Sequence, residues 1–346
     1  MDRFPELSFT VGMPNMVPDQ LSEVELLKIF AEFQWVQLGN ALKCPSHRLV
    51  NDAGERLYAS VVQVESCFGP DDNISQFQEG DEVHARGTVR FYAKHFVEGW
   101  AVFSKEGPVP LTSVSDVATK ADLEQLRSPW ICMTNAIVAR LADNSRLKTF
   151  GPAGIEDADV PVAPEKPLGL SEHERVMQSG EIEPLCGHAR LAPLVPVDDG
   201  PIPYQIALEN DVNGAGLLYF ARFIAMMNYA ERIFLLRRLE RPFSQQLIRF
   251  LSTERRRSFF YANAAETDEV LVYCSGAVID PEAAPQRSGP LRTRALRFQF
   301  FFDLYRKSDG VLMAKSVVTK ALTIPNRFNT LQGEARRFAR SLVDGA

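Results

Sequence analysis

The chain has 346 residues, of which 45% are hydrophobic and 24% charged, and its formal net charge is −6. This length accommodates one large domain or two of ordinary size, and the composition is that of a globular protein and excludes a disordered chain. No apolar run is long enough to cross a bilayer, and residues 1–18 lack the layout of a signal peptide, so we expect a cytoplasmic protein with no membrane partner.

The five cysteines lie far apart in the sequence and form no Cys-x-x-Cys pair; they are Cys44, Cys67, Cys132, Cys186 and Cys274. This spacing argues against a disulfide framework and against a cysteine-based zinc site, and it fits a reducing cytoplasm. We therefore expect no metal and no tightly bound cofactor.

The charge is unevenly distributed along the chain. Residues 1–200 carry 17 Lys/Arg and 30 Asp/Glu, a net charge of −13, whereas residues 201–346 carry 21 and 14, a net charge of +7. An acidic protein without recognition motifs is a poor nucleic-acid binder. The basic half could attract a phosphate-bearing cofactor or an acidic partner protein, unless the two halves simply pack together and neutralise each other.

The first half begins with a short extended segment and then a long apolar helix. Ser22 and Glu25 form a Ser-x-x-Glu capping box at its start, and Gly39 and Asn40 provide a stop signal. Strands are predicted after the helix because residues there are rich in β-formers or alternate between apolar and polar, over 57–64, 83–92, 99–103 and 131–141.

Nine prolines with acidic residues between them fall in residues 151–203, which predicts an extended connection between two halves. The second half repeats the order of the first. A strand at 205–208 leads into Asp-Val-Asn-Gly-Ala-Gly (211–216), a long helix over about 217–239, and strands over 270–278, 296–304 and 312–321.

One long helix followed by a run of strands, twice, predicts an α+β protein in which an antiparallel sheet wraps around each helix. We expect a first module at 1–150, a linker at 151–203, a second module at 204–330 and a helical tail at 331–346. The sequence contains none of the motifs of dinucleotide-binding, P-loop, serine-hydrolase or zincin sites.

This layout resembles the hot-dog fold, and the two halves resemble a double hot dog. The stretch Asp211 to Phe223 is similar to the motif of 4-hydroxybenzoyl-CoA-type thioesterases, with Asn213 at the position of their catalytic aspartate. Nearly the whole chain resembles the bifunctional acyltransferase/decarboxylases of polyketide biosynthesis of the leinamycin type, through the segments GMPNMVPDQLSE, PWICMTNAIVARLADNSRL and DVNGAGLLYFARF. The resemblance implies an enzyme that decarboxylates a malonyl- or methylmalonyl-type unit taken from coenzyme A and delivers the acyl group to the phosphopantetheine arm of an acyl carrier protein.

Asn213 and Gly214 are predicted catalytic residues at the start of the second helix. The Asn213 amide could donate a hydrogen bond to an enolate oxygen, together with helix N-terminal N–H groups, without adding negative charge. The glycines permit close approach of a ligand, and Gly216 is therefore assigned to substrate binding. The alternative is that Asn213 only caps the helix.

The resemblance also implies a tyrosine that carries the acyl group, and Tyr58 best matches it, although a tyrosine in an apolar strand can equally belong to the core. A phenol needs activation, and His47, His84 and His95 are the neighbours considered for that role. Gly12 and Met13, at the entry of the first helix, are the counterparts of the second-half motif. Tyr219 is expected to line the acyl pocket.

Basic residues are needed to hold the phosphates of coenzyme A or of the carrier arm, and Arg255, Arg257 and Arg294 are the candidates, against the alternative of a solvated charged face. Three other functions stay open: a hot-dog thioesterase, a dehydratase, and a non-catalytic module that binds acyl carriers. A homodimer is possible because hot-dog modules tend to pair.

Overall fold

The computed structural model describes residues 5–69, 74–109, 120–126, 128–140, 147–157, 161–194, 200–238, 246–279, 296–322 and 324. The predicted tail at 331–346 and Arg294 lie outside the described residues.

The first module contains one long helix, short turns and the strands that pack on the helix. Its elements are β1 (Glu6–Thr10), η1 (Met13–Asn15), β2 (Met16–Val17), β3 (Gln20–Leu21), α1 (Glu23–Ala41), η2 (Ser46–Arg48), β4 (Leu57–Cys67), η3 (Ile74–Gln76), β5 (Glu82–Tyr92), β6 (Phe96–Ser104), α2 (Lys120–Gln125), β7 (Trp130–Arg140) and β8 (Leu147–Thr149).

The second module repeats this order after a connecting segment. The connection holds η4 (Ile155–Asp157), α3 (Leu168–Ser179) and β9 (Leu191–Pro193), and the module itself consists of β10 (Ile202–Gln205), α4 (Leu208–Asp211), α5 (Phe220–Leu236), η5 (Ile248–Phe250), β11 (Leu251–Phe260), β12 (Glu269–Ile279), β13 (Leu296–Arg306) and β14 (Leu312–Leu322).

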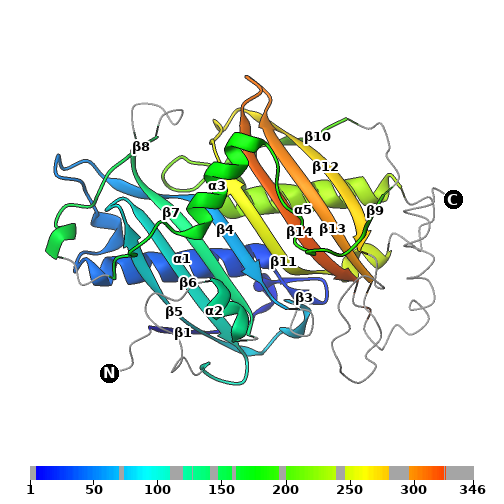
Figure 1. Ribbon diagram of the computed structural model, residues 1–346, viewed down its shortest axis with the longest axis horizontal. Coiled ribbons are helices and arrows are strands. Elements are labelled where there is room, and N and C mark those ends of the chain that lie inside the picture. The colour runs from blue at the N-terminus through cyan, green and yellow to red at the C-terminus, as the bar shows by residue number, and fades with distance from the viewer. Residues whose placement is uncertain are drawn as a thin grey trace.

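The strands of both modules form one antiparallel sheet with two-fold pseudosymmetry. Its main order is β1-β5-β6-β7-β4-β11-β14-β13-β12-β10, so the two halves mirror each other about the β4–β11 pair. The helices α1 and α5 lie side by side on one face of this sheet, and α2 and α3 lie on the opposite face (Figure 1). The predicted arrangement of a sheet wrapped around each of two helices is confirmed.

One large hydrophobic core cluster extends across both modules. Phe298, Phe300 and Phe302 of β13 are all buried on the helix side of the sheet, as the alternation of this strand predicts, and the Phe300 ring meets Phe234 of α5 edge-on at 6.3 Å. Each fully buried phenylalanine contributes about 1.5–3 kcal/mol by burial. This core fixes α5 against its half of the sheet.

The first long helix starts where the sequence predicts, with half of the predicted capping box, whereas the second starts later than predicted. The Ser22 hydroxyl accepts a hydrogen bond from the Glu25 N–H at 3.3 Å, as predicted, but the Ser22 N–H donates to the Asn15 carbonyl instead of to the Glu25 side chain. The second helix begins at Phe220, three residues later than predicted, because residues 212–218 close a turn of their own before it. The glycine motif therefore precedes the helix and does not form its first turn.

The proline-rich segment is not only an extended connection, since it contains the twelve-residue helix α3. This helix ends at Gly180, whose φ of 71° is the left-handed conformation that favours glycine. It packs on β4 and β7, and the Gly169 backbone lies close to the side chains of Gln63 and Thr134. The connection thus covers the outer face of the sheet near the junction of the modules.

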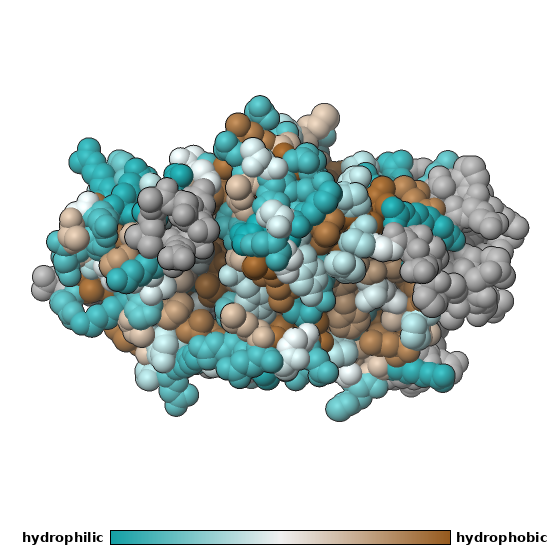
Figure 2. All heavy atoms as spheres, turned by 90° about the horizontal axis from the view of Figure 1, so that it is seen from above, coloured by the Kyte–Doolittle hydropathy of each residue, from teal (hydrophilic) through white to brown (hydrophobic). Residues whose placement is uncertain are grey.

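Within the described residues, no helix combines the length and the apolar composition needed to span a membrane. Figure 2, the view from above, shows hydrophobic residues in small areas among hydrophilic ones, the usual surface of a folded protein.

Candidate functional site

A pocket of about 180 Å³ lies between the two modules, under the middle of α1. Its walls come from α1 (Ala31, Glu32, Gln34, Trp35, Leu38), from β4 and the residue before it (Arg56, Leu57, Tyr58, Ala59, Val61), from β6 and β7 (Val97, Asn135, Ile137), and from the segment before α5 (Asn213, Ala215, Leu217, Tyr219) with Phe220. Three residues singled out from the sequence, Tyr58, Asn213 and Tyr219, thus meet in one pocket although they are far apart in the chain.

The pocket exists because β4 and β11 separate at one end. β4 pairs with β7 over its whole length but with β11 only from Gln63 to Cys67, so residues 57–61 have no strand partner on that edge within the described part of the chain. Beyond Phe260 the chain turns away, and the Asn263 side chain there accepts from the Leu218 N–H at 2.9 Å. This contact holds the segment before α5 opposite the free edge of β4.

Asn213 has a fixed orientation. Its Oδ1 accepts hydrogen bonds from the N–H groups of Ala215 at 2.9 Å and Leu217 at 3.1 Å. Since both partners are donors, the oxygen must face them, and Nδ2 faces the other way. No described residue accepts a hydrogen bond from Nδ2. Asn213 therefore closes the turn before α5 with its oxygen and keeps two N–H donors free in a pocket-lining residue.

Asp211, two residues earlier, is a structural residue. Its carboxylate is fully buried and accepts hydrogen bonds from the Arg222 Nε at 2.7 Å, the Ala207 N–H at 2.8 Å and the Tyr204 hydroxyl at 3.1 Å. These contacts anchor the turn that carries Asn213 to the first turns of α5.

Tyr58 is at the start of β4, opposite Val138 of β7. Leu57 belongs to the same core cluster as Leu38 of α1, so strand alternation directs the Tyr58 side chain to the other face of β4. The Arg56 guanidinium carbon lies 5.3 Å from the centre of the Tyr58 ring. Tyr58 and Arg56 therefore form a rim of the pocket at the free edge of the strand.

The titratable residues among the lining are Glu32, Arg56, Tyr58 and Tyr219. Burial, together with Glu32 and Glu25 nearby, raises the pKa of Tyr219 to about 12, so its phenol is neutral at physiological pH. None of His47, His84 and His95 lines the pocket. Glu32 is the lining carboxylate, and it could not be predicted because a glutamate on a mostly buried helix gives no distinctive sequence pattern.

Gln34 and Asn135 form a buried amide pair in the pocket wall. Gln34 Nε2 donates to the Met133 carbonyl at 3.3 Å, and Gln34 Oε1 accepts from Asn135 Nδ2 at 2.9 Å. Each residue is 5% exposed. Neither residue could be predicted from the sequence, because an amide in a helix and an amide in a strand share no spacing that would link them.

The remaining predicted site residues do not line the pocket. Gly12 and Met13 lie at the entry of α1, where the Gly12 N–H donates to the Asn15 side chain. Gly214 and Gly216 belong to the Asn213 turn, and only Gly216 requires glycine, because its φ is 70°. The catalytic role assigned to Gly214 and the substrate-binding roles assigned to Gly12, Met13 and Gly216 stay predictions.

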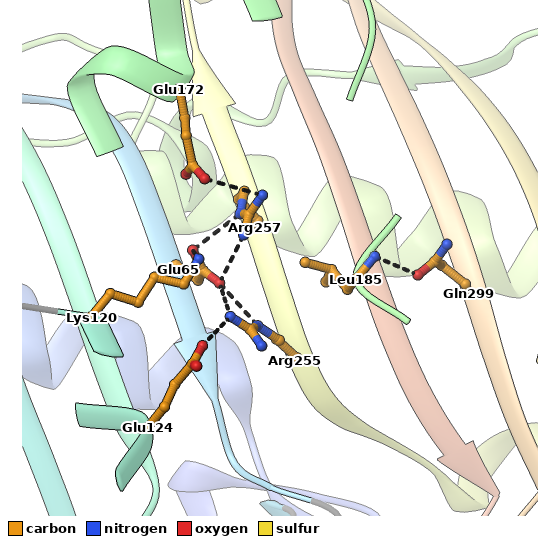
Figure 3. Close-up of polar contacts among 8 residues, drawn as sticks. All are labelled: Glu65, Lys120, Glu124, Glu172, Leu185, Arg255, Arg257 and Gln299. Atoms are coloured by element: carbon orange, nitrogen blue, oxygen red, sulfur yellow. Dashed lines mark hydrogen bonds and ion pairs between the residues drawn. The ribbon is translucent and has the colours of Figure 1, made fainter. Parts of the chain in front are cut away.

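Arg255 and Arg257 lie on the outer face of the sheet with Glu65 (Figure 3). Glu65 accepts from Arg255 Nη2 at 2.7 Å and from Arg257 Nε at 3.0 Å, and Lys120 lies 2.8 Å away. Burial raises the pKa of Glu65, but Arg257, Arg255 and Lys120 outweigh it and hold the pKa at about 2. Both arginines are thus engaged inside the protein, and a role on a phosphate stays a prediction.

The pseudosymmetric counterpart of the pocket is filled with charged pairs. Glu231 of α5 corresponds to Gln34 of α1, because each is the twelfth residue of its helix. Lys320 of β14 corresponds to Asn135 of β7, because each pairs with the residue before a β-bulge in the neighbouring strand. Those residues are Thr253 of β11 and Val61 of β4. In this second half-site Lys320 Nζ binds Glu231 at 2.8 Å.

Glu23 adds a further buried ion pair to the second half-site, which helps to fill it. Its carboxylate accepts from Arg256 Nε at 2.7 Å and from the Thr253 hydroxyl at 2.9 Å. Burial opposes ionisation of Glu23, but Arg256 outweighs it and lowers the pKa. The residue that corresponds to Asn213, seven positions before its helix, is Met16. The two half-sites therefore differ in chemistry, because the neutral amides Gln34 and Asn135 in one half-site correspond to the ion pair of Glu231 and Lys320 in the other.

Comparison with known proteins bears on the fold. No family model and no curated protein sequence matches the chain. A candidate oleoyl thioesterase from Lactobacillus plantarum is similar in structure with a TM-score of 0.55 at 8% identity, over 93% of this chain and 97% of that one. The 12:0-ACP thioesterase from Umbellularia californica has a TM-score of 0.52 at 9% identity, over 92% and 97%. The chain has the double hot-dog fold of these proteins.

Proposed function

We propose that this chain is an enzyme that acts on acyl thioesters of coenzyme A or of an acyl carrier protein, with the thioester bound in the pocket between α1 and the Asn213 turn. The observation that carries the proposal is the orientation of Asn213, whose oxygen is occupied by two backbone N–H groups while its Nδ2 is free. A thioester carbonyl oxygen that accepts from Nδ2 gains negative charge as the reaction proceeds, and a fixed donor in a partly buried site stabilises that charge.

Hydrolysis is the reaction favoured by the structural neighbours, which are named as thioesterases. The Glu32 carboxylate would remove a proton from water, and the hydroxide oxygen would bond to the thioester carbon while the carbonyl oxygen takes charge at Asn213. Breaking of the carbon–sulfur bond would then release the thiolate, which takes up the proton that Glu32 removed from water. A base of this kind contributes about 10²–10⁴-fold to such a step.

A second candidate is decarboxylative acyl transfer, favoured by the amide at position 213. An amide donor stabilises an enolate without placing a carboxylate beside it. The Tyr58 oxygen would displace the coenzyme A thiol from a malonyl-type thioester. Loss of CO2 would leave an enolate that takes a proton on carbon, and the carrier thiol would then take the acyl group from Tyr58. Tyr58 is at the rim of the pocket that Asn213 lines, and this sequence of steps requires its hydroxyl to reach the thioester there.

For either reaction, we propose an acyl carrier protein as partner, a homodimer as a possible assembly and the cytoplasm as the location. Carrier proteins are acidic, and the net charge of +7 over residues 201–346 suits such a partner.

One assay distinguishes the candidates. The protein is incubated with acetyl-, malonyl-, methylmalonyl- and 3-hydroxybutyryl-CoA, with and without a phosphopantetheinylated carrier, and the products are read by mass spectrometry and CO2 release. Free acid indicates a thioesterase, and an acylated carrier lighter by one CO2 indicates the transferase. A 2,3-unsaturated thioester indicates a dehydratase. Carrier binding without any product would leave a non-catalytic module and contradict the proposal.

A further inference from the structure

The amide pair of Gln34 and Asn135 has unused hydrogen-bonding capacity in the pocket wall. The Met133 carbonyl can only accept, so it fixes Nε2 of Gln34 toward itself and Oε1 away from it. Oε1 then requires a donor, which is Nδ2 of Asn135. This chain of contacts leaves Oδ1 of Asn135 as an acceptor without a partner among the described residues, and one N–H of each amide is also unused.

The position of Gln34 is held by packing as well. A Cβ atom at Gly99 of β6 would lie 2.4 Å from Gln34 Nε2 and 2.8 Å from its Cγ, so a side chain at position 99 would displace Gln34. Only glycine leaves room there. The fold therefore accommodates a polar side chain at a buried place that could have been filled by an apolar one.

Burying amides with unused donors and acceptors is costly unless a partner satisfies them, because each unsatisfied group loses its hydrogen bond to water. In the second half-site the corresponding residues satisfy each other, since Lys320 binds Glu231 and also donates to Asn228 at 3.2 Å. In the pocket the described residues supply no corresponding partner, so the unused groups are left to water or to a polar group of a bound molecule that displaces it.

We infer that Gln34 and Asn135 select an acyl group that carries a hydroxyl, or another group that both donates and accepts, close to the thioester. Such a group would donate to Asn135 Oδ1 and accept from a free amide N–H, whereas a plain alkyl chain would leave both amides unsatisfied. The inference rests on the proposed function, because it assigns the acyl group of the thioester to this pocket.

The test compares two non-hydrolysable thioethers, S-(3-hydroxybutyl)-CoA and S-butyl-CoA, by isothermal titration calorimetry with the full chain. The wild type is expected to bind the hydroxybutyl thioether about 10-fold more tightly or better, since one buried hydrogen bond is at stake. This comparison needs no variant, so it does not depend on any substitution folding correctly.

Substitutions then show which residues cause the preference for the hydroxybutyl thioether. Gln34→Leu and Asn135→Leu are each expected to reduce the ratio of the two Kd values to near 1, chiefly by weakening the hydroxybutyl thioether. Gln37→Leu is the matched control, because Gln37 is buried on the same helix but does not line the pocket, and it should keep the wild-type ratio.

Equal affinity of the wild type for both thioethers overturns the selection by the amide pair and leaves the proposed function standing. Absence of binding by either thioether overturns the proposed binding of coenzyme A thioesters in this pocket and this inference with it. A ratio that persists in both leucine variants also overturns the inference, because the preference would then arise elsewhere.

Discussion

Gln34 of α1 and Glu231 of α5 occupy equivalent positions in the two modules, and each binds a strand residue that pairs with the residue before a β-bulge of the neighbouring strand. In the first module the partner is the neutral Asn135, and in the second it is the cation Lys320. The same backbone therefore supports an open pocket in one half and a closed ionic cluster in the other. This difference explains why the candidate site uses the entry of α5 and not that of α1.

The ionic pair of the second module can be converted to the amide pair of the first. Glu231→Gln alone leaves the Lys320 ammonium, which is 6% exposed, without its closest anion and should cost about 3 kcal/mol or more of unfolding free energy. The double change E231Q/K320N restores neutrality, so its cost should be about 1–3 kcal/mol below the sum of the two single changes. Denaturant unfolding of the four proteins measures this, and strict additivity would contradict the assigned coupling.

Much of the architecture could be predicted from the sequence. The alternation of Phe298, Phe300 and Phe302 identified β13, and the cap at Ser22 identified the start of α1, because both signals are local. β11 was missed, since its run from Arg255 to Arg257 resembles an exposed charged segment. In the structure Glu65 and Glu23, both far away in sequence, neutralise these arginines on opposite faces of the strand.

Substitutions of Tyr58 and Tyr219 test which tyrosine, if either, carries the acyl group covalently during transfer. If transfer passes through Tyr58, Tyr58→Phe should abolish a covalent acyl adduct on the protein and reduce transfer to the carrier by about 10²-fold or more. Tyr219→Phe is the control, because the pKa of Tyr219 is raised to about 12 and its phenol is a poor nucleophile at neutral pH. Intact-protein mass spectrometry after rapid quenching measures the adduct. An adduct that survives in Tyr58→Phe would remove Tyr58 from this role.

The outer-face cluster around Glu65 predicts a loss of stability in acid. The folded pKa of Glu65 is about 2, below its ordinary value of 4.5. Its ionised form therefore stabilises the fold above pH 4.5, by about 3 kcal/mol, and this stabilisation is lost as the pH falls toward 2.

Comparison of Glu65→Gln with the wild type checks the sign. The variant should melt at a lower temperature at pH 7, and the difference should shrink between pH 5 and pH 3. Glu124→Gln is the matched control, since Glu124 is 43% exposed and also pairs with Arg255; its effect should be much smaller. A difference in melting temperature that does not change with pH would show that the charge of Glu65 is not the stabilising feature.

The candidate site was only partly predictable, for a physical reason. Asn213 could be found because it stands within a recognisable motif, and Tyr58 because the resemblance pointed to it. Glu32, Gln34 and Asn135 come from a helix and a strand about 100 residues apart, and they meet only because α1 packs across β7 and the β4–β11 seam opens beside it. Such a meeting depends on tertiary packing and leaves no local pattern.

The most direct test of the account is the kinetics of Asn213→Asp on the best thioester substrate of the wild type. Aspartate keeps an oxygen for the N–H groups of Ala215 and Leu217, so the turn and the melting temperature should be preserved. It replaces the free N–H donors with a second carboxylate oxygen, so kcat/KM should fall about 10²–10³-fold. A variant that hydrolyses thioesters as fast as the wild type, or faster, would contradict the role of Asn213 as a hydrogen-bond donor and would indicate a site that works with a carboxylate at this position.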